Sequence, residues 1–175
     1  MPGAPTNVVL VELDEISHAD LRQTYGERWD RRLHARLLDC LRADGASLVV
    51  FDMVFTEPWP DASADQELAD AIRAHGRVVL AADSDNTRRT GIVGTRILPP
   101  TEVLRAATIH WGPTQAEAEE DGVVRKVYRG TEQKPALAWV AASLADATAL
   151  PANAGHLAER WVRYYGPGGT LPRVR

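Results

Sequence analysis

The chain has 175 residues, which suits one compact domain, since domains usually contain about 100 to 200 residues. Hydrophobic residues make up 45% of the chain and charged residues 25%, a composition that is typical of globular proteins and excludes general disorder. The 20 basic and 24 acidic residues give a net charge of -4, so the chain lacks the positive field that attracts nucleic acids, and we expect no nucleic-acid partner.

The first half of the chain alternates between short apolar segments and amphipathic ones. The apolar segments predict buried strands at residues 7–14, 47–51 and 77–82. Residues 30–43 and 65–74 carry apolar side chains at helical spacing. Gly45 follows the first helix as a left-handed C-cap, and Gly76 ends the second. This alternation predicts parallel strands joined by helical crossovers.

The second half has a less regular pattern. Its predicted elements are a turn-rich segment over 84–94, a short helix to about 107, strands at 109–111, 123–128 and 161–165, a helix over 135–147, and a glycine-proline turn at 166–169. The turn signal Asp121-Gly122 favours a hairpin that leads into 123–128. The last helix presents an apolar face made of Leu137, Val140, Ala141 and Leu144.

Together these elements predict an α/β fold. We expect a single domain over residues 1–175, with a largely parallel central sheet, flanking helices and an antiparallel hairpin addition in the second half. No segment reaches the roughly 20 apolar residues of a membrane-spanning helix, so these residues themselves are not expected to enter a membrane.

Several common sites are excluded by spacing. Cys40 is the single cysteine, so no internal disulfide forms, and its apolar helical surroundings predict a buried, inert thiol. The 5 histidines lack the spacing of a helical zinc motif, and neither a Gly-x-Ser-x-Gly serine nor a phosphate-binding loop occurs. We expect no cofactor.

Acidic residues follow the three predicted strands of the first half. These residues are Asp14 and Glu15, Asp52, and Asp83. Because parallel sheets bind ligands at the carboxyl ends of their strands, the acids would converge on a ligand or on a hard cation such as magnesium or calcium. The alternative is structural, since Asp residues also cap helices and bind loop amides.

Two arginines and one tryptophan are further candidates for ligand contact. Arg31 begins a predicted helix, where its guanidinium either pairs with a strand-end acid or meets an anionic ligand. Arg125 follows a predicted turn and faces the same choice, with a charge on the hairpin face as its structural alternative. Trp59 lies between two prolines, and an exposed ring there would serve a ligand or an oligomer contact, whereas most other tryptophans are expected at the core or its edge.

A series of motifs spans nearly the whole chain. The motifs are VVLVELDE at 8–15, WDRRLHARLL at 29–38, the segment from Gly45-Ala46 to Phe51-Asp52, FTEP at 55–58, DQELA at 65–69, VVL at 78–80, Trp111-Gly112, DGVVR at 121–125 and YYGPGG at 164–169. In this order and approximate spacing they resemble the CHASE2 family, the extracytoplasmic sensory domains of bacterial transmembrane receptors.

The resemblance implies a non-catalytic sensor domain on the extracytoplasmic face of the bacterial cell membrane. Such a domain usually follows one membrane helix and precedes several more, and it is coupled to a cytoplasmic kinase or cyclase. Because those parts are absent from this sequence, we expect a module excised from a larger receptor, with an unidentified small-molecule signal as its partner and a homodimer as its assembly.

Two other classes of function remain open at this point. One is a stand-alone metal-dependent hydrolase or transferase that uses Asp14, Asp52 and Asp83 at the sheet edge. The other is a purely structural dimerisation module, which would bind no saturable ligand. The enzyme would turn over a substrate, the sensor would bind a ligand without turnover, and the structural module would do neither.

Overall fold

The computed structural model describes residues 7–89, 92–114, 118–127, 129–131, 133–145, 160–162 and 169–174, with their side chains except those of 85–89, 92–95 and 160. Helices and strands are mixed along the chain, as expected for the predicted α/β class. They fall into two compact units: a terminal unit of Met1–Asp30 and Val162–Arg175, and a core unit of Arg31–Trp161. Among the described residues, no helix is long and apolar enough to cross a membrane.

The terminal unit contains a two-stranded parallel sheet and one short helix. β1 (Leu10–Val11) pairs with β8 (Arg173–Val174). Asp14 then begins α1 (Glu15–Asp20) by accepting a hydrogen bond of 2.9 Å from the backbone N–H of Ser17. The first strand, which was predicted over residues 7–14, contains only two residues. Within the described part of the chain it pairs with the last strand instead of the second predicted strand.

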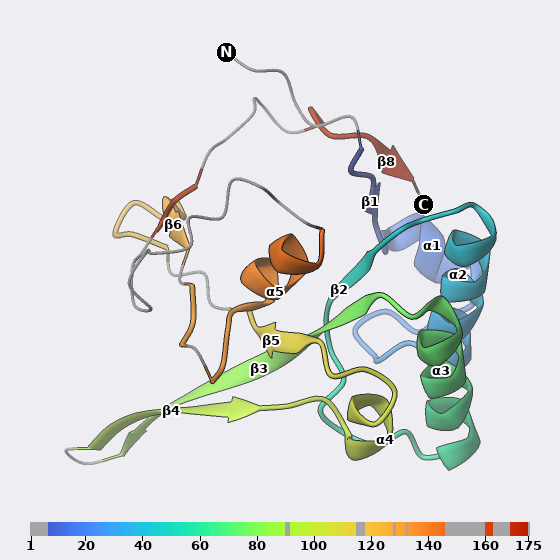
Figure 1. The fold of residues 1–175 in the computed structure, drawn as a ribbon, viewed down its shortest axis with the longest axis horizontal. Helices are drawn as coiled ribbons and strands as arrows, with labels where there is room; N and C mark the ends of the chain where they lie inside the picture. Colours follow the sequence, from blue (N-terminus) through green and yellow to red (C-terminus); the bar gives the residue numbers. More distant parts are fainter. Residues whose placement is uncertain are drawn as a thin grey trace. The chain divides into compact units, whose positions relative to one another are not determined.

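The central sheet of the core unit is built around one long strand (Figure 1). β3 (Val78–Arg89) lies between β2 (Val49–Val54) and β5 (Trp111–Pro113), and both neighbours run parallel to it. The outer part of β3 pairs antiparallel with β4 (Ile92–Leu98), and α4 (Glu102–Arg105) follows that strand. The predicted largely parallel sheet with an antiparallel addition is therefore confirmed.

The antiparallel addition lies earlier in the chain than predicted. The sequence predicts turns over 84–94, but β3 and β4 form a ladder that begins at the pair Asp83 and Leu98 and ends at Arg89 and Ile92. A ladder pairs backbone N–H and C=O groups whatever side chains they carry. The polar composition of this segment, which is unusual for strands, therefore concealed the hairpin.

The turn of the hairpin predicted at Asp121-Gly122 is present, whereas the strand that follows it has a different partner among the described residues. The turn itself is present, with the N–H of Gly122 donating to the carbonyl oxygen of Glu119 at 2.8 Å. However, β6 (Lys126–Val127) pairs with β7 (Arg160–Trp161), which is distant in the sequence. Residues 90–91, 128, 146–147 and 163–168 of the predicted elements lie outside the described part of the chain.

Helices cover both faces of the central sheet (Figure 1). α2 (Arg31–Ala43) and α3 (Ala62–His75) pack on one face, and α5 (Leu137–Leu144) packs on the other. β3 contributes to both cores, because successive side chains of a strand point to opposite faces. Val78 and Leu80 belong to the first core, and Val79 and Ala81 to the second. The predicted apolar face of α5 is confirmed, since all four of its residues belong to the second core.

The ends of α2 and α3 follow local signals in the sequence, whereas Cys40 of α2 does not have the burial that was predicted for it. Gly45 and Gly76 have φ angles of +82° and +79°, in the left-handed region that favours glycine at a helix end. Cys40 is exposed, although a buried thiol was expected. The reason is geometric: Cys40 lies two positions beyond the fully buried Leu38, which places it about 200° around the helix.

Candidate functional site

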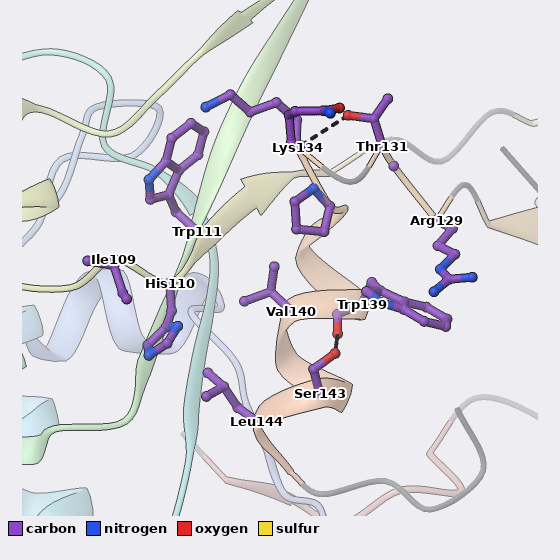
Figure 2. Close-up of a pocket in the computed structure, with 13 residues that line it drawn as sticks. Ile109, His110, Trp111, Arg129, Thr131, Lys134, Trp139, Val140, Ser143 and Leu144 are labelled. Carbon is purple, nitrogen blue, oxygen red and sulfur yellow. Dashed lines mark hydrogen bonds between the residues drawn. The ribbon is translucent and has the colours of Figure 1, made fainter. Parts of the chain in front are cut away.

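A cavity of about 670 Å³ lies in the core unit along one side of α5 (Figure 2). Its wall has three parts: residues 109–111, which lead into β5; residues 129–131 and 133–135, here called the basic hairpin; and α5 itself. Small-molecule sites usually have volumes of about 300–1,000 Å³. The cavity therefore has the size of a binding site for one small molecule.

The basic hairpin is a tight turn whose two limbs are joined by backbone hydrogen bonds. The N–H of Ala136 donates to the carbonyl oxygen of Arg129 at 2.9 Å, and the N–H of Thr131 donates to that of Lys134 at 3.0 Å. Gly130 has a φ angle of +83°, and a Cβ atom on it would collide with the backbone of the opposite limb. Only glycine satisfies both the angle and the close approach.

A second glycine brings the base of the basic hairpin against the sheet. A Cβ atom on Gly112 of β5 would lie only 2.7 Å from the backbone nitrogen of Leu137 and 2.9 Å from the carbonyl carbon of Ala136. The backbone of β5 therefore contacts the start of α5 directly. This close packing fixes the three parts of the cavity wall against one another.

Two cations lie over two tryptophan rings in this wall (Figure 2). The Nζ atom of Lys134 lies 4.2 Å from the ring centroid of Trp111, and the Cζ atom of Arg129 lies 3.8 Å from that of Trp139. Both rings are half-buried. A contact between a cation and an aromatic ring contributes about 0.5–1 kcal/mol of interaction energy where it is exposed to solvent. They also restrict the positions of the two charges.

The rest of the wall is apolar or neutral. Val140 and Leu144 contribute aliphatic side chains from α5, and both also pack against the second core. The hydroxyl of Ser143 donates to the carbonyl oxygen of Trp139 at 2.9 Å. None of the described residues that line the cavity is acidic. The cavity thus combines two positive charges with aromatic and aliphatic surface.

The predicted strand-end acids do not line this cavity. Asp14 caps α1, with its Oδ1 atom accepting from the N–H and the hydroxyl of Ser17 at 2.9 and 2.8 Å, and Glu15 is exposed in the first turn. Asp14 therefore takes the capping role that was the structural alternative. Asp52 and Asp83 are exposed on β2 and β3. Among the described residues, no group of three or more His, Cys, Asp or Glu side chains is placed to hold a metal ion.

Arg31 lies in a buried network on the other side of the sheet. Its side chain is 3% exposed, and its Nε atom lies 3.1 Å from the Oδ1 atom of Asp65. Its Nη2 atom donates to the carbonyl oxygen of Glu57 at 3.1 Å, and its Cζ atom lies 4.4 Å from the ring centroid of Phe55. The backbone N–H of the half-buried Trp59 donates to the Oδ2 atom of Asp65 at 2.8 Å. Arg31 thus forms the structural ion pair, although its partner is a helix residue instead of a strand-end acid.

Arg125 also forms a local ion-pair network. Its guanidinium donates to Asp121 at 2.6 and 2.9 Å and to Glu119 at 2.8 Å. The hydrogen bonds from the side chain of Arg125 and, to a smaller extent, from the backbone N–H of Val123 hold the pKa of Asp121 below its ordinary value. This arrangement is the structural alternative that the sequence left open for Arg125.

The sequence reasoning did not identify the residues of the cavity. Trp111 and Trp139 were expected at the core or its edge, and neither Arg129 nor Lys134 was singled out. One local signal was available: Gly130 and a proline at position 135 bracket a short turn that contains Lys134 and directly follows Arg129. The non-local part, a strand placed beside this turn, cannot be derived from spacing.

The comparisons with known proteins identify the family. A family model described as the CHASE2 domain matches residues 1–175. The chain therefore belongs to the CHASE2 family, which is a family of extracytoplasmic sensor domains, and the resemblance predicted from the motifs is confirmed. No curated protein and no solved structure matches the chain.

Proposed function

We propose that this CHASE2 domain is the signal-binding part of a bacterial transmembrane receptor, and that a small molecule binds in the cavity beside α5. The observation that carries the proposal is the cavity itself: about 670 Å³, with two cations held over two tryptophans, in a member of a sensor family. No reaction is required. A signal acts by binding one arrangement of the domain more tightly than another.

A route for the signal leads from the basic hairpin to the terminal unit. Arg129 follows β6 by two residues, and β6 is paired with β7. The Nζ atom of Lys126 in β6 lies 5.4 Å from the ring centroid of Trp161 in β7. Trp161 ends the core unit, and the next residue belongs to the terminal unit. A ligand that displaces the basic hairpin would therefore move β6, then β7, and then the chain that enters the terminal unit.

The rest of the proposed receptor lies outside this sequence. The terminal unit pairs the first and last strands, and in the proposal it is coupled through membrane helices to a cytoplasmic kinase or cyclase. The receptor is proposed to be a homodimer. The metal-dependent hydrolase that uses Asp14, Asp52 and Asp83 stays a prediction, and no observation on the described residues favours it.

The location is tested with reporter fusions in the native reading frame that contains this domain. Alkaline phosphatase, which is active only outside the cytoplasm, is fused directly after the domain and compared with a fluorescent protein that matures only inside. We expect phosphatase activity without fluorescence. Fluorescence without phosphatase activity would place the domain inside the cell and contradict the proposal.

The binding site is tested by filling the cavity. Ser143→Trp places a large ring in the cavity wall, whereas Ser47→Trp places the same ring on an exposed serine that does not line it. Small metabolites are screened by backbone amide NMR with the 175-residue chain. We expect compounds that shift the resonances of the cavity residues and that lose binding in Ser143→Trp but not in Ser47→Trp. Equal binding to both variants would contradict the proposed site.

A further inference from the structure

We propose that the terminal unit contains a proton-sensitive latch, which is closed while His18 is neutral and opens when His18 takes up a proton. The latch is the hydrogen bond between the imidazole of His18 in α1 and the indole of Trp29. It holds the ends of the segment 21–30, here called the entry loop. The latch is separate from the cavity beside α5 and does not depend on a ligand there.

The geometry of the latch fixes the protonation state of His18. The Nε1–H of Trp29 donates to the Nε2 atom of His18 at 3.1 Å, and the two rings meet edge to face with their centroids 4.8 Å apart. An indole N–H can only donate, so the Nε2 atom must offer a lone pair. The imidazole then carries its single proton on Nδ1. His18 is therefore neutral in this arrangement.

A second proton on His18 is incompatible with this contact. It would bind to Nε2 and turn that atom into a donor that faces the indole N–H of Trp29. Trp29 is 6% exposed, and the Nδ1 atom of His18 is buried without a hydrogen-bond partner among the described residues. The charged imidazole would thus lack a partner for both of its N–H groups. Because a buried charge without partners is costly, the two rings would separate.

The charged groups on α1 favour uptake of the proton. Asp14 and Glu15 lie four and three positions before His18, the spacing at which helix side chains are neighbours. Tyr25 of the entry loop contacts the imidazole ring, with centroids 5.3 Å apart. The other charged residues of the described terminal unit are Glu12 and Arg173, which pair with each other at 3.0 Å, and Asp20, Arg22, Glu27, Arg28 and Asp30. Two acids therefore attract the proton that the bond from Trp29 resists.

Opening of the latch would loosen the entry loop. Gln23 also links the ends of this loop, since its N–H donates to the carbonyl oxygen of His18 at 2.8 Å and its Oε1 atom accepts from the N–H of Asp30 at 3.0 Å. Residues 24–28 between these contacts are exposed. The entry loop leads directly into α2, which begins at Arg31. Loss of the bond to Trp29 would therefore change the segment through which the chain enters α2.

The latch gives the domain a response to acid. Histidine is the side chain that changes its charge between about pH 5 and pH 8. CHASE2 is a family of extracytoplasmic sensor domains, and such domains meet the pH of the surroundings. A fall in external pH would open the latch whether or not a ligand occupies the cavity.

The test follows the indole of Trp29 and the imidazole of His18 through the same pH range. NMR spectra of the 175-residue chain are recorded from about pH 8 to about pH 5, with the Trp29 indole N–H, the His18 ring Cε1–H and the amides of the entry loop as probes. We expect the three probes to change with one common midpoint, because one proton opens the latch. The indole N–H signal is expected to move upfield as it loses its acceptor.

Two matched substitutions assign the response to His18. His18→Gln keeps an acceptor for the indole but takes up no proton, and we expect it to abolish the pH dependence of the Trp29 signal. His75→Gln is the control in the core unit, where His75 accepts from the backbone N–H of Arg77 at 3.3 Å. This control is expected to leave the response of Trp29 unchanged. Circular dichroism of both variants at neutral pH verifies that the fold is retained.

Four outcomes would overturn the proposal. A constant Trp29 signal while His18 takes up its proton would show that the hydrogen bond survives the charge. A response of Trp29 that persists in His18→Gln would assign it to another group. Constant amide signals in the entry loop would separate the latch from the loop, and a His18 ring that takes up no proton above about pH 5 would leave no switch. If His18→Gln does not fold, the titration of the unchanged chain decides alone.

Discussion

The core unit places an arginine over an aromatic ring on each side of its sheet, and the two sites differ in what surrounds the charge. Arg31 lies 4.4 Å from the ring centroid of Phe55 and is bonded to the buried carboxylate of Asp65. Arg129 lies 3.8 Å from that of Trp139 in the wall of a cavity that has no acid among its described residues. The same contact therefore occurs once in a buried ion-pair network, here called the closed network, and once in the wall of a cavity, here called the open site.

The difference follows from the cost of burying charge. A guanidinium with a side chain that is 3% exposed needs a carboxylate and further hydrogen bonds, and Arg31 has Asp65 and the carbonyl oxygen of Glu57. Arg129 is half-buried beside a cavity, where solvent or a ligand reaches the charge. An arginine over a ring is thus a poor indicator of function by itself. The exposure of the charge, and not the contact with a ring, distinguishes the two sites.

The strongest test of this comparison is to remove the carboxylate of the closed network. Asp65→Ala leaves the charge of Arg31 buried without its acid, and we expect a loss of about 3–5 kcal/mol in the free energy of unfolding. Arg129→Gln is the matched change at the open site, with an expected loss below about 1 kcal/mol. Urea denaturation measures both. Equal losses in the two variants would show that the two arginines do not differ in role.

A second test addresses the basic hairpin, which holds both cations of the open site. Gly130→Ala combines a φ angle of +83° with a collision against the opposite limb, and we expect a loss of about 1–3 kcal/mol in the free energy of unfolding. Gly122→Ala is the control, because its φ angle of +78° is similar but nothing lies within 4 Å of the added Cβ atom. Urea denaturation is measured on both. An equal loss in the two variants would show that the close approach of the opposite limb adds nothing to the cost of the φ angle.

Local signals in the sequence predict the helices of this fold better than its strand pairing. The helix expected over 65–74 is present as α3, and it begins earlier because Asp61 accepts a hydrogen bond from the N–H of Ser63. Such caps depend on residues a few positions apart. By contrast, β1 pairs with β8 at the other end of the chain, and no local pattern specifies that partner. The sequence predicted β3 only as a buried strand and did not show that helices pack on both of its faces.

The candidate site divides in the same way between local and non-local information. The capping role of Asp14 and the network of Arg125 involve residues within six positions in the sequence, and both were foreseen as alternatives. The ion pair of Arg31 with Asp65 joins two helices. The cavity requires β5, the basic hairpin and α5 together. Its chemistry therefore became visible only when the three segments were placed in space.

The smallest expected effect concerns Arg32, which follows Arg31 in the chain but is 35% exposed. Its Nη2 atom lies 2.6 Å from the Oδ2 atom of Asp61, and this contact with the bonds from Ser63 lowers the pKa of Asp61 to about 2. The ordinary pKa of an aspartate is about 3.9, so this pair contributes stability above about pH 4 that is lost as the pH falls through about 2.

Asp61→Asn isolates that charge, because asparagine still caps α3. We expect the unfolding free energy of the variant to fall less than that of the unchanged chain between about pH 4 and pH 2, with only a small difference at neutral pH, where exposed pairs contribute little. Urea denaturation at several pH values measures the slopes. Equal slopes would mean that an exposed arginine-carboxylate pair stabilises nothing here. Carboxylates would then matter to the arginines of this fold only where burial, as at Arg31, makes the charge costly.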